Sequence, residues 1–499
     1  MRNTVKKRGP GLRRVLALLA VLAVGVGSTA CDFLDPTEVE NPRTTDDDLA
    51  EAQEPTKALV PGLQAQFARL LEATVVATEC ASDNYQINGT GIDDTWDSPQ
   101  DITPLVANST GRVTGAYWNA QELTALASFV INDIIPNDDT AETNDIARAY
   151  YYRGMGYLHL AENFSYAPIE EDGTPVGSGQ ILELAIADLT EATAGGPEVS
   201  VPASAALARA YRWQGNTSSA AAAANQAINA DPDFAFTQGY DAASIDNTPH
   251  WYLVTRALAE MQPLPRLDFL DPKYLSYADD IPVAKAEEMH LILAEVALVG
   301  SDYDAAKEHL GSAIRLAQSR ETVLWVDDDL RSNQDLTVRP RDSEIEIRAD
   351  ANSPYRAGLI QDRAGAETTQ YIISGTSLNA DSVEALPNGD PDAIWHSLWL
   401  ARQEIMFLEG RRLADLGIRL PIMRREIDQN PNIDFGDLGT EPFVPGYIPP
   451  FRQMDLFTPK SPYEGGTGPL VTDQVTIEHD MNRILVENSA SPFLTDVLF

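Results

Sequence analysis

Residues 203–232 read ASAALARAYRWQGNTSSAAAAANQAINADP, and this stretch decides the fold class. Alanine, the residue with the highest helix propensity, recurs through both halves of it. Its small side chain lets two helices approach each other closely, and Pro232 ends the second helix because proline cannot continue one. The stretch therefore predicts a pair of antiparallel helices.

The same stretch matches one tetratricopeptide repeat, a unit of two packed helices. Its packing positions hold Leu207, Ala208, Tyr211, Ala220 and Ala227. A second unit spans residues 285–319, and a third pair of helical segments spans residues 145–164 and 180–194 around a long insertion. Because helix pairs bury their apolar faces only by stacking on one another, these segments predict one helical scaffold.

The rest of the chain adds helices and long irregular stretches to this scaffold. Helical periodicity marks residues 59–79 and 116–135, whereas residues 81–115 are rich in Gly, Asp, Asn, Thr and Pro and are predicted to form loops. Strand-like segments are few, with residues 368–374 as an example. The predicted fold class is mostly α: a tetratricopeptide-like helix-pair scaffold with long irregular loop insertions.

The N-terminus has the layout of a bacterial export signal. Six basic residues lie within residues 2–14, an apolar run follows at residues 15–26, and Ser28 and Ala30 precede Cys31. The run is too short to span a bilayer. Cys31 holds the acylation position of bacterial lipoproteins, so we predict lipidation there; a signal cleaved elsewhere, with Cys31 unmodified, is the alternative. The predicted parts are a lipoprotein signal peptide (1–30), a lipidated tether (31–57) and a folded domain (58–499).

The chain is strongly acidic, with 36 basic and 75 acidic residues and a formal net charge of −39. Removing residues 1–30 takes away six basic residues and no acidic one, which leaves a net charge of −45. Such a surface repels phosphate backbones, so we exclude nucleic-acid binding. It suits a solvated protein in an extracellular or saline setting, and the acidic runs at residues 46–48 and 327–329 lack calcium-loop spacing.

The sequence carries no motif of a familiar catalytic or cofactor site. Patterns of the Gly-x-Ser-x-Gly, His-Glu-x-x-His, Cys-x-x-Cys and phosphate-loop types are missing, and the six histidines are scattered. We therefore predict no enzyme activity, no cofactor and no metal. A surface glycan hydrolase stays open as an alternative, since 75 acidic residues could place some carboxylate pair at glycosidase spacing.

Several segments resemble the SusD/RagB family of outer-membrane nutrient-binding lipoproteins. Residues 31–35, Cys-Asp-Phe-Leu-Asp, are similar to the family's mature N-terminus. Residues 153–169 resemble its R-A-x-x-Y-F-x-L…Y-G-x-V-P-L stretch, and Ala294-Glu295 with Arg315 resembles its A-E-A helix and downstream arginine. The most specific match is to its late helix, E-R-x-x-E-L-x-F-E-G-x-R-x-x-D-L, at Arg402, Glu409, Gly410, Arg412 and Asp415.

The late segment also has a purely structural interpretation. Glu409 and Arg412 are spaced i,i+3, as are Arg412 and Asp415. Arg411 and Asp415 are spaced i,i+4. On one continuous helix these charges would form a ladder of ion pairs along one face. The opposite face would be apolar, with Ile405, Leu408, Leu413 and Leu416. We favour this packing role over a role in ligand binding.

The resemblance implies a SusD-like α-helical binding domain over residues 58–499. It implies a lipid-anchored protein of the outer membrane, exposed at the cell surface, that binds an oligosaccharide or similar nutrient. It also implies a partner, a SusC-like TonB-dependent outer-membrane transporter, which receives the nutrient. The helix pairs leave another function open: a tetratricopeptide-type adaptor in envelope protein assembly.

Sugars present apolar C–H faces and polar edges, so a site needs aromatic rings beside amide and carboxylate groups. The foremost candidate is Trp96, because the surrounding DDTWDSP at residues 93–99 is polar on both sides and offers no helical core. The same loop-rich region supplies Asp83, Asn84 and Tyr85, and Trp325 is a further candidate in an irregular segment. Three other tryptophans are predicted to pack in the core: Trp118, Trp395 and Trp399.

Overall fold

The computed structural model describes residues 54–87, 94–109, 115–254, 261–325, 344–361, 367–458 and 474–499. The predicted signal peptide, Cys31 and residues 31–53 of the predicted tether lie outside these ranges. The first described helix, α3, spans Pro55–Cys80, so the last three residues of the predicted tether belong to it.

Three long helices pack together near the start of the described chain. α3 lies against α5 (Gly115–Phe129) and α6 (Thr143–Asn163). α5 runs on into a π-helical turn, η4 (Val130–Ile134), and a 3-10 turn, η5 (Ile135–Asn137). The helices predicted at residues 59–79 and 116–135 are therefore confirmed. None of the described helices has both the length and the apolar character needed to cross a membrane.

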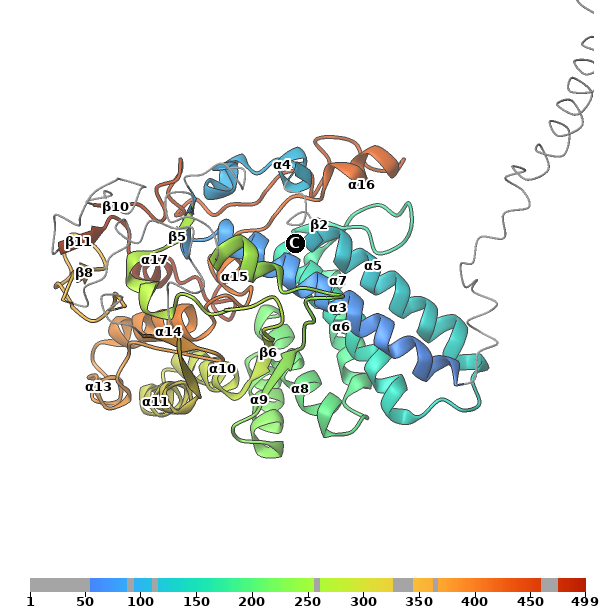
Figure 1. Cartoon of the computed structure of the whole chain (residues 1–499), viewed down its shortest axis with the longest axis horizontal. Coiled ribbons are helices and arrows are strands. Elements are labelled where there is room, and N and C mark those ends of the chain that lie inside the picture. Colours follow the sequence, from blue (N-terminus) through green and yellow to red (C-terminus); the bar gives the residue numbers. More distant parts are fainter. Residues whose placement is uncertain are drawn as a thin grey trace, which may run out of the picture. The chain divides into compact units, whose positions relative to one another are not determined.

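Helices α6 to α11 form the predicted stack of pairs. α6 packs on α7 (Ser178–Ala192), α8 (Pro197–Trp213) on α9 (Thr217–Ala230), and α10 (Ala286–Val299) on α11 (Tyr303–Ser319). Neighbouring pairs meet through α7 with α8 and through α9 with α10 (Figure 1). The three predicted helix pairs and the mostly α fold class are confirmed.

The turn between α8 and α9 shows how the sequence ends one helix and begins the next. Gly215 adopts a φ of 71°, in the left-handed region that favours glycine. Asn216 then caps α9, because its side chain accepts a hydrogen bond from the backbone N–H of Ser219. Ala220 and Ala224 of α9 are completely buried, which brings the backbone of α9 close to its neighbours.

Short helices and small sheets complete the described fold. The short helices are η2 (Asp94–Asp97), η3 (Pro99–Asp101), α4 (Pro104–Ser109), η6 (His250–Val254), η7 (Pro265–Leu270), α13 (Ala380–Glu384), α16 (Arg424–Gln429) and α17 (Met481–Glu487). The antiparallel strand pairs are β1 (Tyr85–Ile87) with β5 (Met261–Pro263), β2 (Tyr166–Ala167) with β3 (Val176–Gly177), β4 (Ala235–Gln238) with β6 (Ile281–Lys285), and β7 (Thr322–Trp325) with β9 (Thr368–Tyr371). In a three-stranded sheet, β11 (Gln474–Ile477) lies between β10 (Phe457–Thr458) and a parallel β8 (Glu346–Arg348). β9 confirms a strand within residues 368–374.

The late motif does not form the single helix that its spacing suggested. α14 spans Pro391–Ile405, and the next helix, α15, spans only Arg412–Asp415. Between them Leu408 and Gly410 adopt φ values of 57° and 72°, which no right-handed helix allows. The predicted ladder of ion pairs along one helix face is therefore wrong. The apolar residues of the motif do pack in the core, where Ile405, Leu408, Leu413 and Leu416 are completely buried.

The tryptophans predicted to lie in the core separate into two groups. Trp399 is buried, as predicted, and Trp395 packs partly buried against the cluster formed by α10, α11, α13 and α14. The prediction for Trp118 is wrong, because its side chain in α5 is 36% exposed. The guanidinium of Arg425, in α16, lies 4.1 Å from the centre of the Trp118 ring, so a cation rather than the core covers it.

Gly410 allows a direct test of the break between α14 and α15. A Cβ there would lie 3.4 Å from Thr74 Cγ2, an ordinary contact, so the space is sufficient. The positive φ is the obstacle, and Gly410→Ala is expected to lower the free energy of unfolding by about 1–2 kcal/mol. Urea denaturation measures this, with Gly389→Ala as the control because Gly389 lacks a positive φ and its Cβ position is open. Equal effects of the two variants would contradict the prediction.

Candidate functional site

Four of the five predicted ligand-binding side chains are buried in the structure. Asp83, Asn84 and Tyr85 are 0% exposed and Trp96 is 1% exposed. Asp83 and Asn84 follow the end of α3, Tyr85 begins β1, and Trp96 lies in η2. The expectation that Trp96 projects from an exposed loop is wrong. The strand β1 pairs with β5, more than 170 residues away in the chain, and this pairing draws the polar segment into the interior.

Each of the three residues at the end of α3 has buried protein partners instead of solvent. Asn84 Nδ2 donates to Glu79 Oε2 at 2.6 Å. The hydroxyl of Tyr85 donates to Asp271 Oδ1 at 3.2 Å, and its ring stacks on Phe407 with centroids 5.7 Å apart. These contacts fix the junction of α3, β1 and the α14–α15 turn, and they leave little of these side chains for a ligand.

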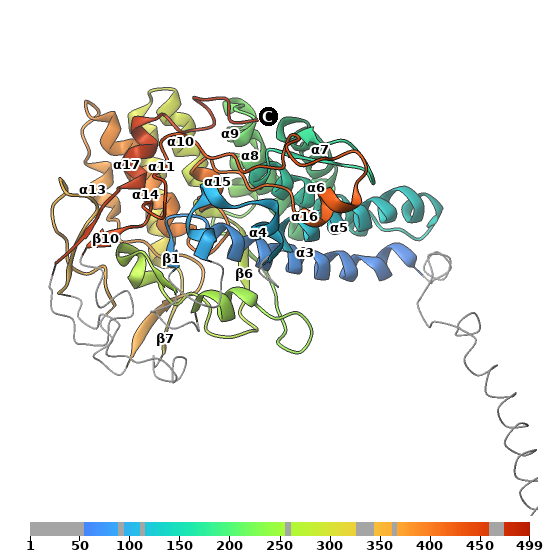
Figure 2. The same ribbon diagram turned by 90° about the horizontal axis from the view of Figure 1, so that it is seen from above.

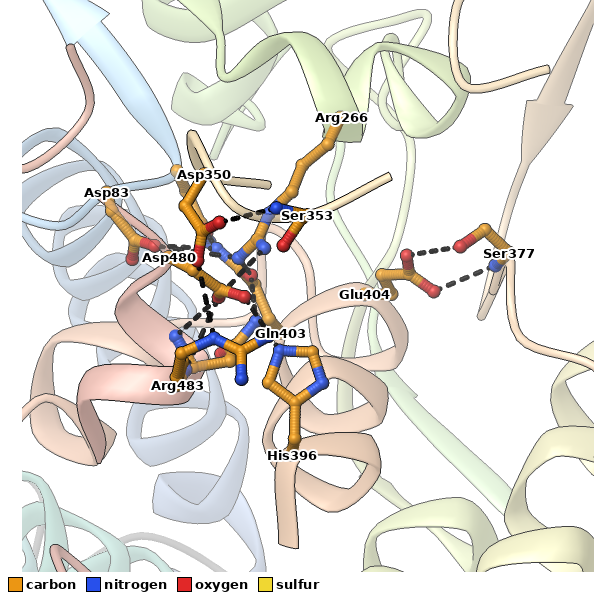
Figure 3. A network of polar contacts seen from close by, with 12 residues as sticks. Asp83, Arg266, Asp350, Ser353, Ser377, His396, Gln403, Glu404, Asp480 and Arg483 are labelled. Carbon is orange, nitrogen blue, oxygen red and sulfur yellow. Dashed lines mark hydrogen bonds and ion pairs between the residues drawn. The ribbon is translucent and has the colours of Figure 1, made fainter. Parts of the chain in front are cut away.

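A network of polar contacts extends from Asp83 to Asp480 and His396 (Figure 3). Arg412 Nε and Nη2 donate to the two oxygens of Asp83 at 2.5 and 2.8 Å. Gln403 Nε2 also donates to Asp83 Oδ2, at 2.9 Å, and Arg266 Nη2 donates to the side-chain amide oxygen Oε1 of Gln403. Arg266 Nη1 reaches Asp480 Oδ1 at 3.4 Å. The chain of contacts therefore joins α14, α15, η7 and the start of α17.

The network reaches solvent through His396, which contacts the buried Asp480. His396 Nε2 lies 2.8 Å from Asp480 Oδ2, and the His396 side chain is 24% exposed. Burial alone would raise the pKa of Asp480, but the hydrogen bond with His396 and the charge of Arg266 lower that pKa below its usual range. Asp480 also caps α17 by accepting from the backbone N–H groups of Asn482 and Arg483. The carboxylate is thus held ionised as a structural anchor.

A second buried group, which we call the motif core, contains Glu295, Arg402 and Asp415 of the SusD/RagB-like motifs. Its other members are Glu162, Arg209, Arg212, Glu288 and Arg411. Arg402 donates to both oxygens of Asp415 at 2.9 and 3.0 Å. Arg212 Nη1 lies 3.0 Å from Asp415 Oδ1 and donates from Nε to Glu295 Oε2 at 2.5 Å. Glu295 of the A-E motif and Asp415 of the late motif are therefore joined through one arginine.

The geometry of the motif core supports a structural role. The cavity among these residues has a volume of about 10 Å³, enough for one water molecule and too small for a nutrient. Beside it, Glu409 accepts from both Lys273 and Lys285, at 2.5 and 2.6 Å. Burial lowers the pKa of Lys273 to about 8 in spite of the neighbouring Glu409. These buried charges form ion pairs with one another, as the packing interpretation of the motif predicts.

Trp325 is the one predicted ligand residue that the structure leaves partly exposed. It ends β7, which pairs with β9 so that Trp325 lies opposite Thr368 and Leu324 lies opposite Thr369. Leu324 is 63% exposed, whereas Thr368 and Gln370 are buried, so the two faces of this ribbon differ. The indole Nε1 of Trp325 is buried and has no hydrogen-bond partner among the described residues.

Further exposed aromatic side chains lie outside the stack of helix pairs. Trp251 in η6 is 42% exposed and Tyr277 is 37% exposed. Tyr277 packs edge-on against His250, with ring centroids 4.7 Å apart. Sequence reasoning gave little weight to Trp251 and missed Tyr277, because neither residue lies in a motif. Across the described ranges, no group of three or more His, Cys, Asp or Glu side chains is placed to hold a metal ion.

Several solved structures are similar to this chain at low sequence identity. No protein-family model matches the chain, and no curated protein does. A SusD-like carbohydrate-binding protein from Bacteroides vulgatus is 15% identical, with a TM-score of 0.45 over 72% of this chain and 82% of that one. SusD superfamily proteins from Bacteroides thetaiotaomicron and Bacteroides fragilis are 12% and 14% identical, with TM-scores of 0.49 and 0.47. These matches cover 77% of this chain in both cases, and 92% and 100% of the two relatives. The chain is thus similar to SusD-like proteins.

Proposed function

We propose that this protein is a lipid-anchored, non-enzymatic binding protein of the outer membrane that captures an oligosaccharide or similar nutrient. It delivers this nutrient to a SusC-like TonB-dependent transporter. The observation that carries the proposal is the ordered set of SusD/RagB-like motifs behind an export signal that ends at Cys31. The joining of two of these motifs in the motif core, through Arg212, supports a shared architecture.

The proposed contact region is the ribbon of β7 and β9, with Trp325 as its aromatic residue. An indole ring covers the apolar face of a sugar, and neighbouring polar groups bind its hydroxyls. Leu324 and Thr369 lie opposite each other on the other face of the ribbon, so the indole of Trp325 is the apolar surface on its own face. Binding energy then comes from stacking and hydrogen bonds, and the transporter supplies the energy for uptake.

Trp325→Ala is expected to weaken oligosaccharide retention at least tenfold, which corresponds to about 1.4 kcal/mol. The purified protein is first screened against immobilised oligosaccharides, and affinity electrophoresis then compares the variants on the glycan retained best. Trp118→Ala is the matched control, because Trp118 is also a partly exposed tryptophan but belongs to α5, away from β7 (Figure 2). Failure of the wild-type protein to bind any glycan contradicts the function; unchanged binding by Trp325→Ala contradicts only the position of the site.

The partner and the absence of catalysis need separate experiments. Purification of the native lipoprotein in mild detergent should bring down a large β-barrel transporter. Recovery of an envelope assembly complex instead would support the adaptor alternative.

Release of shorter sugars on incubation with the bound oligosaccharide would support the hydrolase alternative. Mass spectrometry of the mature N-terminal peptide tests the acyl chains at Cys31.

A further inference from the structure

Two histidines that are 19 residues apart in the sequence meet on one helix pair. His290 lies in α10 and His309 in α11, and their Nδ1 atoms are 3.2 Å apart. The ring centroids are 5.5 Å apart with an angle of 40° between the planes. Both side chains are only partly buried, so the pair is open to solvent. It lies outside the motif core and takes no part in the polar network around Asp83.

The distance between the two nitrogens suits a shared metal ion. Two imidazole nitrogens bound to one zinc ion at about 2.0–2.1 Å, with a tetrahedral angle between them, are about 3.3 Å apart. Because the observed distance between the two Nδ1 atoms is 3.2 Å, metal binding needs almost no rearrangement of the helices. A hydrogen bond between neutral rings fits the same distance, and a change of tautomer frees both Nδ1 lone pairs without changing the charge of either ring.

The surroundings favour the neutral form of both rings. Burial, and next the neighbouring His309, lower the pKa of His290 to about 4. Burial also lowers the pKa of His309. Protonation to the imidazolium form therefore competes less with a metal ion here than at a solvated histidine. The carboxylates of Glu287 and Glu308 add negative charge nearby, and Glu287 itself is already paired with Arg320.

The other described histidines lack this arrangement. His159 is buried in the core close to Arg209 and Arg411. His250 contacts the carbonyl of Tyr274, and His396 pairs with Asp480.

We propose that His290 and His309 form a two-histidine site for one divalent transition-metal ion, with water in the remaining coordination positions. Imidazole ligands favour Cu²⁺ over Zn²⁺, and both over Mg²⁺ and Ca²⁺.

Calorimetric titration with Cu²⁺ in excess Mg²⁺ tests this site, because Mg²⁺ occupies the many surface carboxylates. The wild-type protein should bind one Cu²⁺ ion per chain, and His290→Asn or His309→Asn should weaken that binding at least tenfold. His479→Asn is the matched control, since His479 follows β11 and lies outside the pair. Absence of binding to the wild type, or equal losses in all three variants, would overturn the proposal.

A spectroscopic measurement on the unmodified protein covers the case in which a variant does not fold. Electron paramagnetic resonance of the stoichiometric Cu²⁺ complex counts the directly bound nitrogens. Hyperfine coupling to two nitrogens supports the site, and coupling to one or none overturns it.

Discussion

Asp415→Asn is expected to lower the free energy of unfolding by about 3–5 kcal/mol. Asp415 is fully buried between Arg402 and Arg212, and both guanidinium groups lie within 3.0 Å of its oxygens. Burial would raise the pKa of this carboxyl, but the two arginines hold it below its usual value. An asparagine removes the negative charge and leaves two buried cations with less compensation. Breaking a buried pair from one side carries this large penalty because the remaining charge cannot regain water.

The matched control for this prediction is Asp428→Asn. Asp428 also pairs with an arginine, Arg424, at 2.7 Å, but both side chains are about half exposed. Exposed pairs of this kind contribute about 0–1 kcal/mol, so the control should unfold almost as the wild type does. Guanidinium denaturation gives both free energies. A loss of less than 1 kcal/mol for Asp415→Asn would show that the motif core does not hold the scaffold together.

The second large effect is a loss of stability as the pH rises, caused by Glu79. Burial raises the pKa of Glu79 to about 7, although hydrogen bonds from Asn84 and Gly410 oppose the shift. Between pH 4.5 and about 7 the folded chain keeps this proton while the unfolded chain has released it. The free energy of unfolding therefore falls as the pH rises through this window, by about 3 kcal/mol from this group. Above about pH 7 both states are ionised and the contribution is constant.

Glu79→Gln should remove this contribution, because glutamine has no proton to lose. The stability of the variant relative to wild type is expected to increase between pH 4.5 and about 7, and urea denaturation across this range measures the difference. Glu183→Gln, on the exposed face of α7, should leave the pH dependence unchanged. Parallel pH profiles for wild type and Glu79→Gln would contradict the assignment.

The helix pairs could be predicted because their signal is local. In α8 and α9 the alanine spacing, the turn at Gly215 and Asn216 and the stop at Pro232 all lie within thirty or so consecutive residues. The same kind of signal predicted α10 and α11. Local patterns of this sort survive tertiary packing, because the buried face that they define is the one on which the pairs stack.

The candidate site could not be predicted in the same way, because distant pairings decide it. The polar composition around Trp96 indicated an exposed loop, but the pairing of β1 with β5 buries this region. The i,i+3 spacing of Glu409 and Arg412 indicated neighbours on one helix, but Gly410 turns the chain between them. Glu409 then pairs with Lys273 and Lys285, and Arg412 pairs with Asp83. No sequence spacing encodes those partners.

The bond between Asp83 and Arg412 has a consequence for the order in which the molecule assembles. The two residues are 329 positions apart, yet they share a bidentate contact in the interior. During synthesis the segment around Asp83 emerges long before Arg412 exists to neutralise it. The polar segment that follows α3 therefore gains this partner only when the last quarter of the polypeptide has been made.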